Sequence, residues 1–504
     1  MKHPFKIFAL ISFGVLSGHT LFAQDETDAL RYSFLQPQGT ARSIGIGSAL
    51  GSVGGDFSSL SVNPAGIGIY RKSEFMFTPS LMLNNSSSGS DGGNGAHFSF
   101  SNVGVVWTSA ARGRRYDRSP WKSVSFGFGI NRMADFTRDV TYGGTNTNSS
   151  GSLVFQNDAN NLHYDINPDN FSGNSLAYLG YQSYLFDTAT LSGGFPGYLS
   201  NINPSATAPI NQYTTIKERG GISELVFTLG GNYQEHLMLG ATVGLPVVNY
   251  TRDKTFQESG LAAASGGYLN SFRYTENLRT SGLGVNLKLG AIYKPNDNFR
   301  IGAAVHTPSY IALSDVQDQQ VESNVTGIGV VSVSATQNQY NYAITTPWRG
   351  VASATAILGK YGFVTADYEY VDYSSTRFTF DDVDADAERQ INSNIRNTYQ
   401  GASNIRLGAE ARLDALALRA GFGYYGNPYK SSVSGDGEHY DLSAGIGFRS
   451  KRGAFVDFAF VHHQYKNNET PYTLPSNITA DYRPVLSPVT SRQNNIAMTV
   501  GWKF

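Results

Sequence analysis

Cysteine is absent from this 504-residue chain, so disulfide bonds are excluded and no lipid can be attached through an N-terminal cysteine. An excess of charge is missing too. The 38 Lys and Arg residues face 39 Asp and Glu, which gives no case for a nucleic-acid partner. Beyond the N-terminus no run of about 18 apolar residues occurs, and this excludes membrane-spanning helices. It does not exclude a membrane, because closed sheets of strands also cross bilayers.

What the chain has in abundance is aromatic residues and glycine, with 30 Tyr, 30 Phe and 55 Gly. Patterns that favour helices are scarce, so the composition indicates strands that are rich in aromatic residues and punctuated by glycine. The length would allow several domains, but barrels of this size can form a single unit.

The first 23 residues have the layout of a secretory signal peptide. Lys2 and Lys6 give a basic start, residues 7–16 are apolar, and Ala23 is a small residue at the expected cleavage site. The alternative is a membrane anchor, which would need a longer apolar run and a stop-transfer pattern. Cleavage predicts a mature chain that begins at Gln24.

Fourteen strand-like segments follow one another from Glu74 to the C-terminus. Alternate connections among the later segments are very short, such as residues 359–360 and 451–452, whereas those between them are long and polar. The longest connection is predicted at about 135–220. Short turns at one end and long loops at the other, with an even number of strands, are typical of a transmembrane β-barrel. The predicted strands span residues 74–84, 95–108, 121–134, 221–233, 236–250, 271–293, 298–313, 338–358, 361–376, 397–413, 415–426, 438–450, 453–466 and 491–504.

The strands alternate apolar and polar residues. Leu283, Val285 and Leu287 share one face of their segment, and Asn286 and Lys288 share the other. A soluble barrel would bury the apolar face, whereas a membrane barrel turns it to lipid and turns the polar face to the lumen. Alternation at period two is compatible with both kinds of barrel, but strand segments of ten or more residues favour a membrane crossing. We therefore predict an all-β fold, a 14-stranded antiparallel transmembrane β-barrel spanning residues 74–504.

The last predicted strand ends on an aromatic residue. Val500, Trp502 and Phe504 belong to one apolar row at period two. This row resembles the C-terminal insertion signal of bacterial outer-membrane barrels, which implies the barrel-assembly machinery as a partner. We expect Phe504 to face lipid at the periplasmic interface and the last strand to pair with the first, which leaves no open edge. An ordinary soluble strand is the alternative for this segment taken alone.

Residues 24–73 differ from the barrel strands in being rich in glycine, serine and small apolar residues. The segment is too long and too apolar for a solvated linker, so we predict a plug folded into the lumen. Within it Asn63 precedes Pro64, and this pair predicts a short helical turn with Asn63 in an extended or capping conformation. The sequence Asn-Pro-Ala alone is too common to indicate a function.

The leader, the segment DFSSLSVNPAGIGIY and the fourteen strands together resemble the FadL-type family of long-chain fatty-acid transporters of the bacterial outer membrane. The resemblance covers nearly the whole mature chain and includes the segments LGATVGLPV, IYKPNDNFRIGAAVHTP and TPWRGVASATAIL. The plug segment is similar to that of Bacteroidetes-type members, often labelled hemin receptor or aromatic-hydrocarbon transporter.

This resemblance implies passive uptake of long-chain fatty acids or other hydrophobic small molecules through a barrel with an N-terminal hatch. It implies no enzymatic activity, cofactor or metal, and a monomer in contact with outer-membrane lipid and lipopolysaccharide. The hatch residues that it implies are Asp56, Phe57, Asn63, Pro64 and Ala65.

In the family, a kink in the third strand opens a lateral portal to the bilayer. Gly127 or Gly129 would supply that kink here, because glycine tolerates a bulge or a bend. The alternative is that these glycines only relieve crowding inside the barrel.

The predicted long loop holds the candidates for substrate capture. Leu176, Leu179, Tyr181, Tyr184 and Phe186 would line a groove outside the lipopolysaccharide layer. Each methylene moved from water into such a groove gains about 0.8 kcal/mol, which is enough to hold a long chain without polar recognition. The alternative is a cap that packs on itself.

Charged residues on the polar faces of neighbouring strands predict an ion network that props the lumen and holds the plug. Its predicted members are Asp367, Glu369, Arg406, Glu410, Arg412 and Arg419.

Two other functions stay open at the level of sequence. A hemin-binding receptor would need an axial ligand, for which His97, His163 and His439 are candidates in or near outer loops. An outer-membrane phospholipase would need a Ser-His-carboxyl set, and no nucleophile elbow or other catalytic motif is present. The acidic run 381–388 lacks the glycine and the terminal glutamate of an EF-hand loop, so we predict no metal site.

Overall fold

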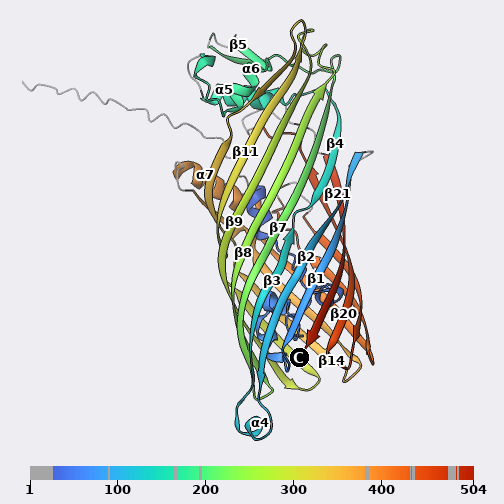
Figure 1. Ribbon diagram of the computed structural model, residues 1–504. Helices are drawn as coiled ribbons and strands as arrows, with labels where there is room; N and C mark the ends of the chain where they lie inside the picture. Colours follow the sequence, from blue (N-terminus) through green and yellow to red (C-terminus); the bar gives the residue numbers. More distant parts are fainter. Residues whose placement is uncertain are drawn as a thin grey trace, which may run out of the picture.

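The computed structural model describes residues 26–88, 91–162, 167–191, 194, 196–380, 385–431, 433, 437–474, 484 and 487–504. The predicted signal peptide lies outside this range. Figure 1 shows a tall barrel of tilted strands, with the N-terminal helices inside it and a small cap at one end. Of the described helices, none is both long enough and apolar enough to cross a membrane.

The wall is one closed antiparallel sheet with 14 strand positions, as predicted. The uninterrupted strands are β1 (Glu74–Ser88), β2 (Asp91–Ala110), β7 (Ile210–Tyr233), β8 (Leu237–Ser259), β9 (Leu269–Asn296), β17 (Gly401–Leu413), β18 (Leu416–Tyr425), β19 (His439–Arg449), β20 (Ala454–Glu469) and β21 (Ser487–Lys503). The other positions each hold two strands in line: β3 (Trp121–Asp135) with β4 (Arg138–Asn146), β10 (Phe299–His306) with β11 (Tyr310–Val325), β13 (Asn338–Thr345) with β14 (Arg349–Ile357), and β15 (Gly362–Asp372) with β16 (Arg377–Phe380).

The sheet closes where the last strand meets the first. β21 pairs with β1 from Lys503 opposite Glu74 to Thr490 opposite Ser87. The backbone amide of Phe504 also donates to the carbonyl of Ser73 at 2.9 Å. The C-terminus therefore lies at the end with the short turns (Figure 1), and the expected pairing of the two terminal strands is confirmed.

The side chains are arranged as in a membrane barrel. Leu283 is 59% exposed on the outer face of β9, whereas Lys288 on the inner face is only 3% exposed. The same split places Leu407 outside and Arg406 inside on β17. Apolar residues that face outward and buried charges that face inward are the reverse of a soluble protein, which confirms the predicted orientation of the faces.

Proline breaks two strands that the sequence predicted as continuous. Pro308 lies between β10 and β11, and Pro347 lies between β13 and β14. Proline has no N–H to donate to the ladder, so the pairing stops on both sides of it. Pro246 interrupts the pairing of β8 with β9 in the same way, between Gly244 and Val247.

The predicted loop 135–220 begins and ends with strand residues in the structure, so this prediction was too wide. β4 and the first half of β7 pair with each other and extend the wall beyond the predicted limits. The described residues between 147 and 209 then form the cap, with α5 (Ser152–Leu162), η2 (Pro168–Asn170), α6 (Leu176–Gln182) and the hairpin of β5 (Phe186–Thr190) and β6 (Pro196–Ser200). β12 (Gly329–Ser334) pairs with the far end of β11, next to this cap. α7 (Ala385–Thr398) packs against β16 and against η3 (Tyr373–Ser375), which precedes β16 in the chain. At the opposite end α4 (Arg114–Arg118) protrudes below the barrel (Figure 1).

Residues 26–73 lie inside the barrel, and we call this segment the plug (Figure 1). It contains α1 (Glu26–Ser33), α2 (Ala41–Gly45), α3 (Ser59–Val62) and η1 (Pro64–Ile69). α2 contacts β18 to β21, whereas η1 contacts β3, β7, β8 and β9 on the other side of the lumen. The plug therefore spans the barrel from wall to wall.

Candidate functional site

The Asn63 turn, which consists of Asn63 and η1, joins the plug to the wall. Asn63 has an extended backbone (φ −141°, ψ 104°), and its Oδ1 accepts from the Ala65 amide at 3.1 Å. This capped turn with Pro64 at its first position confirms the local prediction. The Asn63 Nδ2 donates to the Gly51 carbonyl at 2.6 Å and to the Ala291 carbonyl at 3.3 Å. One fully buried amide thus joins two parts of the plug to β9.

Glycines in the wall allow this close approach. A Cβ added at Gly240 would overlap the Pro64 carbonyl, and one added at Gly290 would overlap the Asn63 side chain. A Cβ at Gly230 would lie 2.6 Å from the Ile67 side chain. The Asn63 turn therefore rests on bare backbone of β7, β8 and β9.

Asp56 and Phe57 stabilise the loop that precedes the turn. Asp56 accepts from the Thr40 hydroxyl at 2.8 Å and from the Ser58 amide at 3.0 Å. Phe57 is fully buried, and a Cβ at Gly129 would lie 2.6 Å from its ring. A Cβ at Gly127 would lie 2.5 Å from Leu60. Both glycines of the third strand thus make room for the plug.

The third strand is irregular further along than these glycines. Gly127 and Gly129 pair regularly with both neighbouring strands, whereas the register with β7 shifts between Arg132 and Ala134. The pairing of β2 with β3 begins only at Asn102, so in the described wall residues 91–101 of β2 have no partner in β3. β4 lies next to this part of β2, since a Cβ added at Gly93 or Gly95 would meet Asp139 of β4. The discontinuity of the wall lies there, and β4 covers it.

Ion pairs join the plug to the opposite wall. Arg42 of α2 lies 3.1 Å from Glu410, and the Gly51 amide donates to Asp367 at 2.9 Å. Glu410 also pairs with Arg419 at 2.8 Å. The predicted network that holds the plug is therefore present, and its remaining predicted contacts are Arg412 with Glu410 at 2.7 Å and Arg406 with Glu369 at 3.4 Å.

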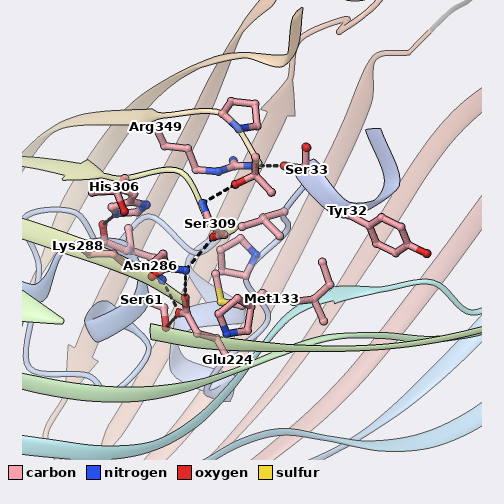
Figure 2. Close-up of a pocket in the computed structure, with 18 of the residues that line it drawn as sticks. Tyr32, Ser33, Ser61, Met133, Glu224, Asn286, Lys288, His306, Ser309 and Arg349 are labelled. Carbon is pink, nitrogen blue, oxygen red and sulfur yellow. Dashed lines mark hydrogen bonds and ion pairs between the residues drawn. The ribbon is translucent and has the colours of Figure 1, made fainter. Parts of the chain in front are cut away.

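A small, partly enclosed cavity of about 40 Å³ lies next to the plug, between α1 and the Ser61–Val62 backbone. Figure 2 shows its charged end, where Glu224 accepts from the Ser61 hydroxyl at 2.9 Å and from the Asn286 amide at 3.0 Å. Lys288 pairs with the same carboxylate. Arg349 pairs with Glu369 at 3.3 Å and donates to the Ser33 carbonyl of α1. Both α1 and α3 are thus bonded to the charged walls of this cavity.

The other side of the cavity is apolar. Its lining there is made by Leu35, Pro37, Val62, Met133, Ile222, Pro246, Ile311 and Pro347. The strand breaks at Pro308 and Pro347 lie at the same level, and their flanking residues Thr307, Ser309 and Thr346 line the cavity as well. The cavity thus offers apolar surface with a cluster of paired cations and carboxylates at one end, a combination that is common in sites for small molecules.

Sequence reasoning did not find this cavity. It placed Lys288 on the inner face of its strand but did not single out Glu224, His306 or Arg349. The available signal was the pair of prolines within predicted strands, because each marks a place where the ladder is interrupted.

Comparison with known proteins shows to which family this barrel belongs. Residues 225–504 match the model of the family described as outer membrane protein transport protein (OMPP1/FadL/TodX). The chain belongs to this family. Among curated proteins, none matches the chain. Members of the FadL/TodX family are transport channels rather than enzymes, and the family and the barrel together indicate an outer-membrane protein.

Solved structures share the FadL/TodX fold with this chain at low sequence identity. The toluene transporter TbuX of Ralstonia pickettii is 15% identical with a TM-score of 0.53, and the match covers 93% of this chain and 99% of TbuX. A FadL homologue of Pseudomonas aeruginosa is 12% identical with a TM-score of 0.52, over 94% and 100% of the two chains. The toluene transporter TodX of P. putida is 13% identical with a TM-score of 0.52, over 94% and 99%.

In this FadL/TodX-type barrel the predicted capture residues do not line an open groove together. Leu179 and Phe186 are buried in the core of the cap, so they are unavailable at its surface. Leu176 and Tyr181 pack partly against the same core, and Tyr184 is exposed with its ring centroid 6.2 Å from that of Tyr268. The cap packs on itself and on the outer ends of β8, β9 and β11, through Phe256, Phe272 and Val321 among others.

The histidines considered for heme lie apart from one another. The His439 ring packs between Phe34 and Tyr465, with centroids 4.6 and 4.7 Å away. His97 lies on β2 with its Nε2 3.5 Å from Asp135. His163 lies outside the described residues. No observation favours a heme site over the cavity.

Proposed function

We propose that this chain is a passive channel for hydrophobic small molecules, long-chain fatty acids among them, with the plug acting as its hatch. The observation that supports this most is the cavity beside the plug, which has an apolar wall and an end where Lys288 and Arg349 pair with Glu224 and Glu369. At about 40 Å³ it is too small for a whole ligand of this kind, so it has to widen as the plug moves. TbuX and TodX are toluene transporters, so neutral aromatic hydrocarbons are the second class of cargo to test.

Gating follows from the position of the plug. In this closed state the Asn63 turn and α2 block the lumen from opposite walls. A ligand that leaves the cavity toward the short-turn end has to displace the plug, which breaks hydrogen bonds worth about 1 kcal/mol each. A lateral exit would use the discontinuity between β2 and β3 near Arg132 in place of Gly127 or Gly129.

A disulfide lock tests the hatch, because the chain has no cysteine of its own. The hydroxyls of Ser52 in the plug and Thr355 in the wall lie 2.7 Å apart, so Ser52→Cys with Thr355→Cys places two thiols in contact. We expect the oxidised variant to lose uptake of oleate and toluene in a transporter-deficient strain, and a reductant to restore it.

The matched control joins two wall strands and leaves the plug free. Ser80 and Ser99 have hydroxyls 2.8 Å apart, on β1 and β2. Oxidised Ser80→Cys with Ser99→Cys should keep wild-type uptake. Full uptake through the locked plug would contradict gating by this segment and leave lateral exit as the route.

A further inference from the structure

A second cavity, which we call the vestibule, lies on the opposite side of the plug, at the short-turn end. Its volume is about 580 Å³, and it lies between the plug loop around Gly54 and the ends of the surrounding wall strands. In outer-membrane barrels the short-turn end faces the periplasm. Among the residues that line the vestibule none is acidic, and the cationic ones are Arg42, Arg71, Lys72, Arg300, Arg412, Arg449 and Lys503.

The carboxylates next to these cations are too few to neutralise them. Glu410 by itself forms ion pairs with three arginines, at nitrogen–oxygen distances of 3.1, 2.7 and 2.8 Å. They are Arg42, Arg412 and the neighbouring Arg419. With Arg419 the cluster has eight cations. The carboxylates that pair with it number five, which leaves an excess of three positive charges; they are Asp56, Glu74, Glu235, Glu410 and Asp457.

Three buried donors of residues that line the vestibule have no acceptor among the described residues. Arg300 pairs with no carboxylate in the described part of the chain; its Nη1 donates to the Val53 carbonyl at 2.6 Å, and its buried Nε has no partner there. The buried Nε of Arg449 is likewise without a partner among the described residues. Tyr70 is only 3% exposed, and its buried hydroxyl finds no partner within the same range. Buried donors of this kind normally have an acceptor, so these three groups are available to bind one that a ligand supplies.

Apolar side chains lie between the cations. Val53, Ile69, Ile357, Phe363 and Phe455 line the same vestibule. The combination of guanidinium groups, one phenol and apolar surface suits an anion that carries a hydrocarbon chain. A planar carboxylate matches the fork of an arginine, which donates two parallel hydrogen bonds to it.

We propose that the vestibule binds the carboxylate of an amphiphilic acid, with Arg300, Arg449 and Tyr70 as donors. This inference rests on the proposed function, because it assigns to the cargo an acidic head group that is held after the ligand has passed the plug. The positive vestibule then favours acids over neutral hydrocarbons at the periplasmic end of the channel.

Calorimetric titration of the purified mature chain in a neutral maltoside detergent tests the proposal. The probes are dodecanoate and dodecanol, which share a chain and differ in the carboxylate. The wild type should bind dodecanoate more tightly. Arg300→Gln should weaken dodecanoate binding roughly 10- to 100-fold, as expected for the loss of one charge-assisted hydrogen bond, and leave dodecanol unchanged. Tyr70→Phe, which removes one oxygen atom only, should weaken it in the same direction.

Arg114→Gln is the matched control, because it removes a positive charge at the same end of the barrel from the exposed helix α4. It should bind both probes like the wild type. Unchanged dodecanoate binding by Arg300→Gln and Tyr70→Phe would overturn the proposal. Tighter binding of dodecyl phosphate than of dodecanoate would also overturn it, since the site would then suit a phospholipid head group.

Transport measured on the same preparation separates this proposal from the proposed function. Wild-type protein in vesicles that moves neither dodecanoate nor toluene would refute the channel, whatever the titration shows. Transport of both, together with a dodecanoate affinity that does not depend on Arg300, would refute the vestibule site alone.

Discussion

Asn63 illustrates how much of the plug depends on one buried amide. Its hydrogen bonds to Ala65, Gly51 and Ala291 use both ends of the side chain, so a residue without a donor and an acceptor cannot replace it. The sequence predicted the capped turn from Asn63 and Pro64. The bond to the Ala291 carbonyl was not predictable, because it joins residues that are 228 positions apart.

Asp158 in α5 is a buried carboxyl group whose charged form is disfavoured by its surroundings. It is 5% exposed within the cap and accepts from the Ala177 amide at 2.8 Å, at the start of α6. Burial raises the pKa of its carboxyl from 3.8 to about 6, although the hydrogen bonds from the Ala177 and Leu176 amides oppose this rise. The protonated form is thus favoured in the folded cap.

The cap should therefore lose stability as the pH rises through about 6, because the folded-state pKa lies above the unfolded one. Asp158→Asn keeps an acceptor for Ala177 and removes this loss, which is at most about 3 kcal/mol for a shift of two units. Amide hydrogen exchange of α6 at pH 5 and pH 8, corrected for intrinsic rates, measures the effect. Asp187→Asn, an exposed carboxylate of the same cap, is the control. Equal pH dependence in the wild type and in Asp158→Asn would contradict the assignment.

At the scale of elements, the contact between η1 and the wall depends on what the wall strands lack. β7, β8 and β9 present glycine at the positions that face the Asn63 turn, so the turn packs on backbone. Alternation along each strand predicted that these positions face inward. It did not predict which of the many inward glycines meet the plug, because that depends on the path of a different segment.

Gly240→Ala should move the Asn63 turn away from β8, because the added methyl group would overlap the Pro64 carbonyl. Overpacking of this kind costs about 1–3 kcal/mol. We expect a larger ion leak through the variant than through the wild type in planar bilayers. Gly350→Ala is the control, since a Cβ at that wall glycine meets nothing within 4 Å. The same conductance in both variants would argue against a plug held by this contact.

At the scale of the whole molecule, closure of the sheet depends on β21 pairing with both β20 and β1. Trp502 and Phe504 are exposed on its outer face, next to the start of the barrel. Both side chains point outward, as the exposed apolar residues of the neighbouring strands do. Packing inside the barrel therefore does not account for these aromatic residues. Their position supports the predicted role in insertion.

Trp502→Ala with Phe504→Ala should lower the amount of folded barrel in the outer membrane several-fold, because the assembly machinery would lose its recognition row. The heat-dependent shift of the folded band in gel electrophoresis of membrane fractions measures this amount. Tyr361→Ala removes an exposed aromatic residue from a short turn at the same end and should have no effect. Normal levels of the double variant would exclude the predicted insertion signal.

The sequence by itself determined the barrel, its inverted faces, the capped turn and the closing pair of strands. These features follow from alternation at period two and from turn chemistry, both of which are local to a few residues. Only the tertiary structure decided where the wall breaks, which glycines receive the plug and how two cavities come to lie on either side of it. Those features depend on contacts between segments hundreds of residues apart, and a pattern within one strand carries no information about the neighbour it will meet.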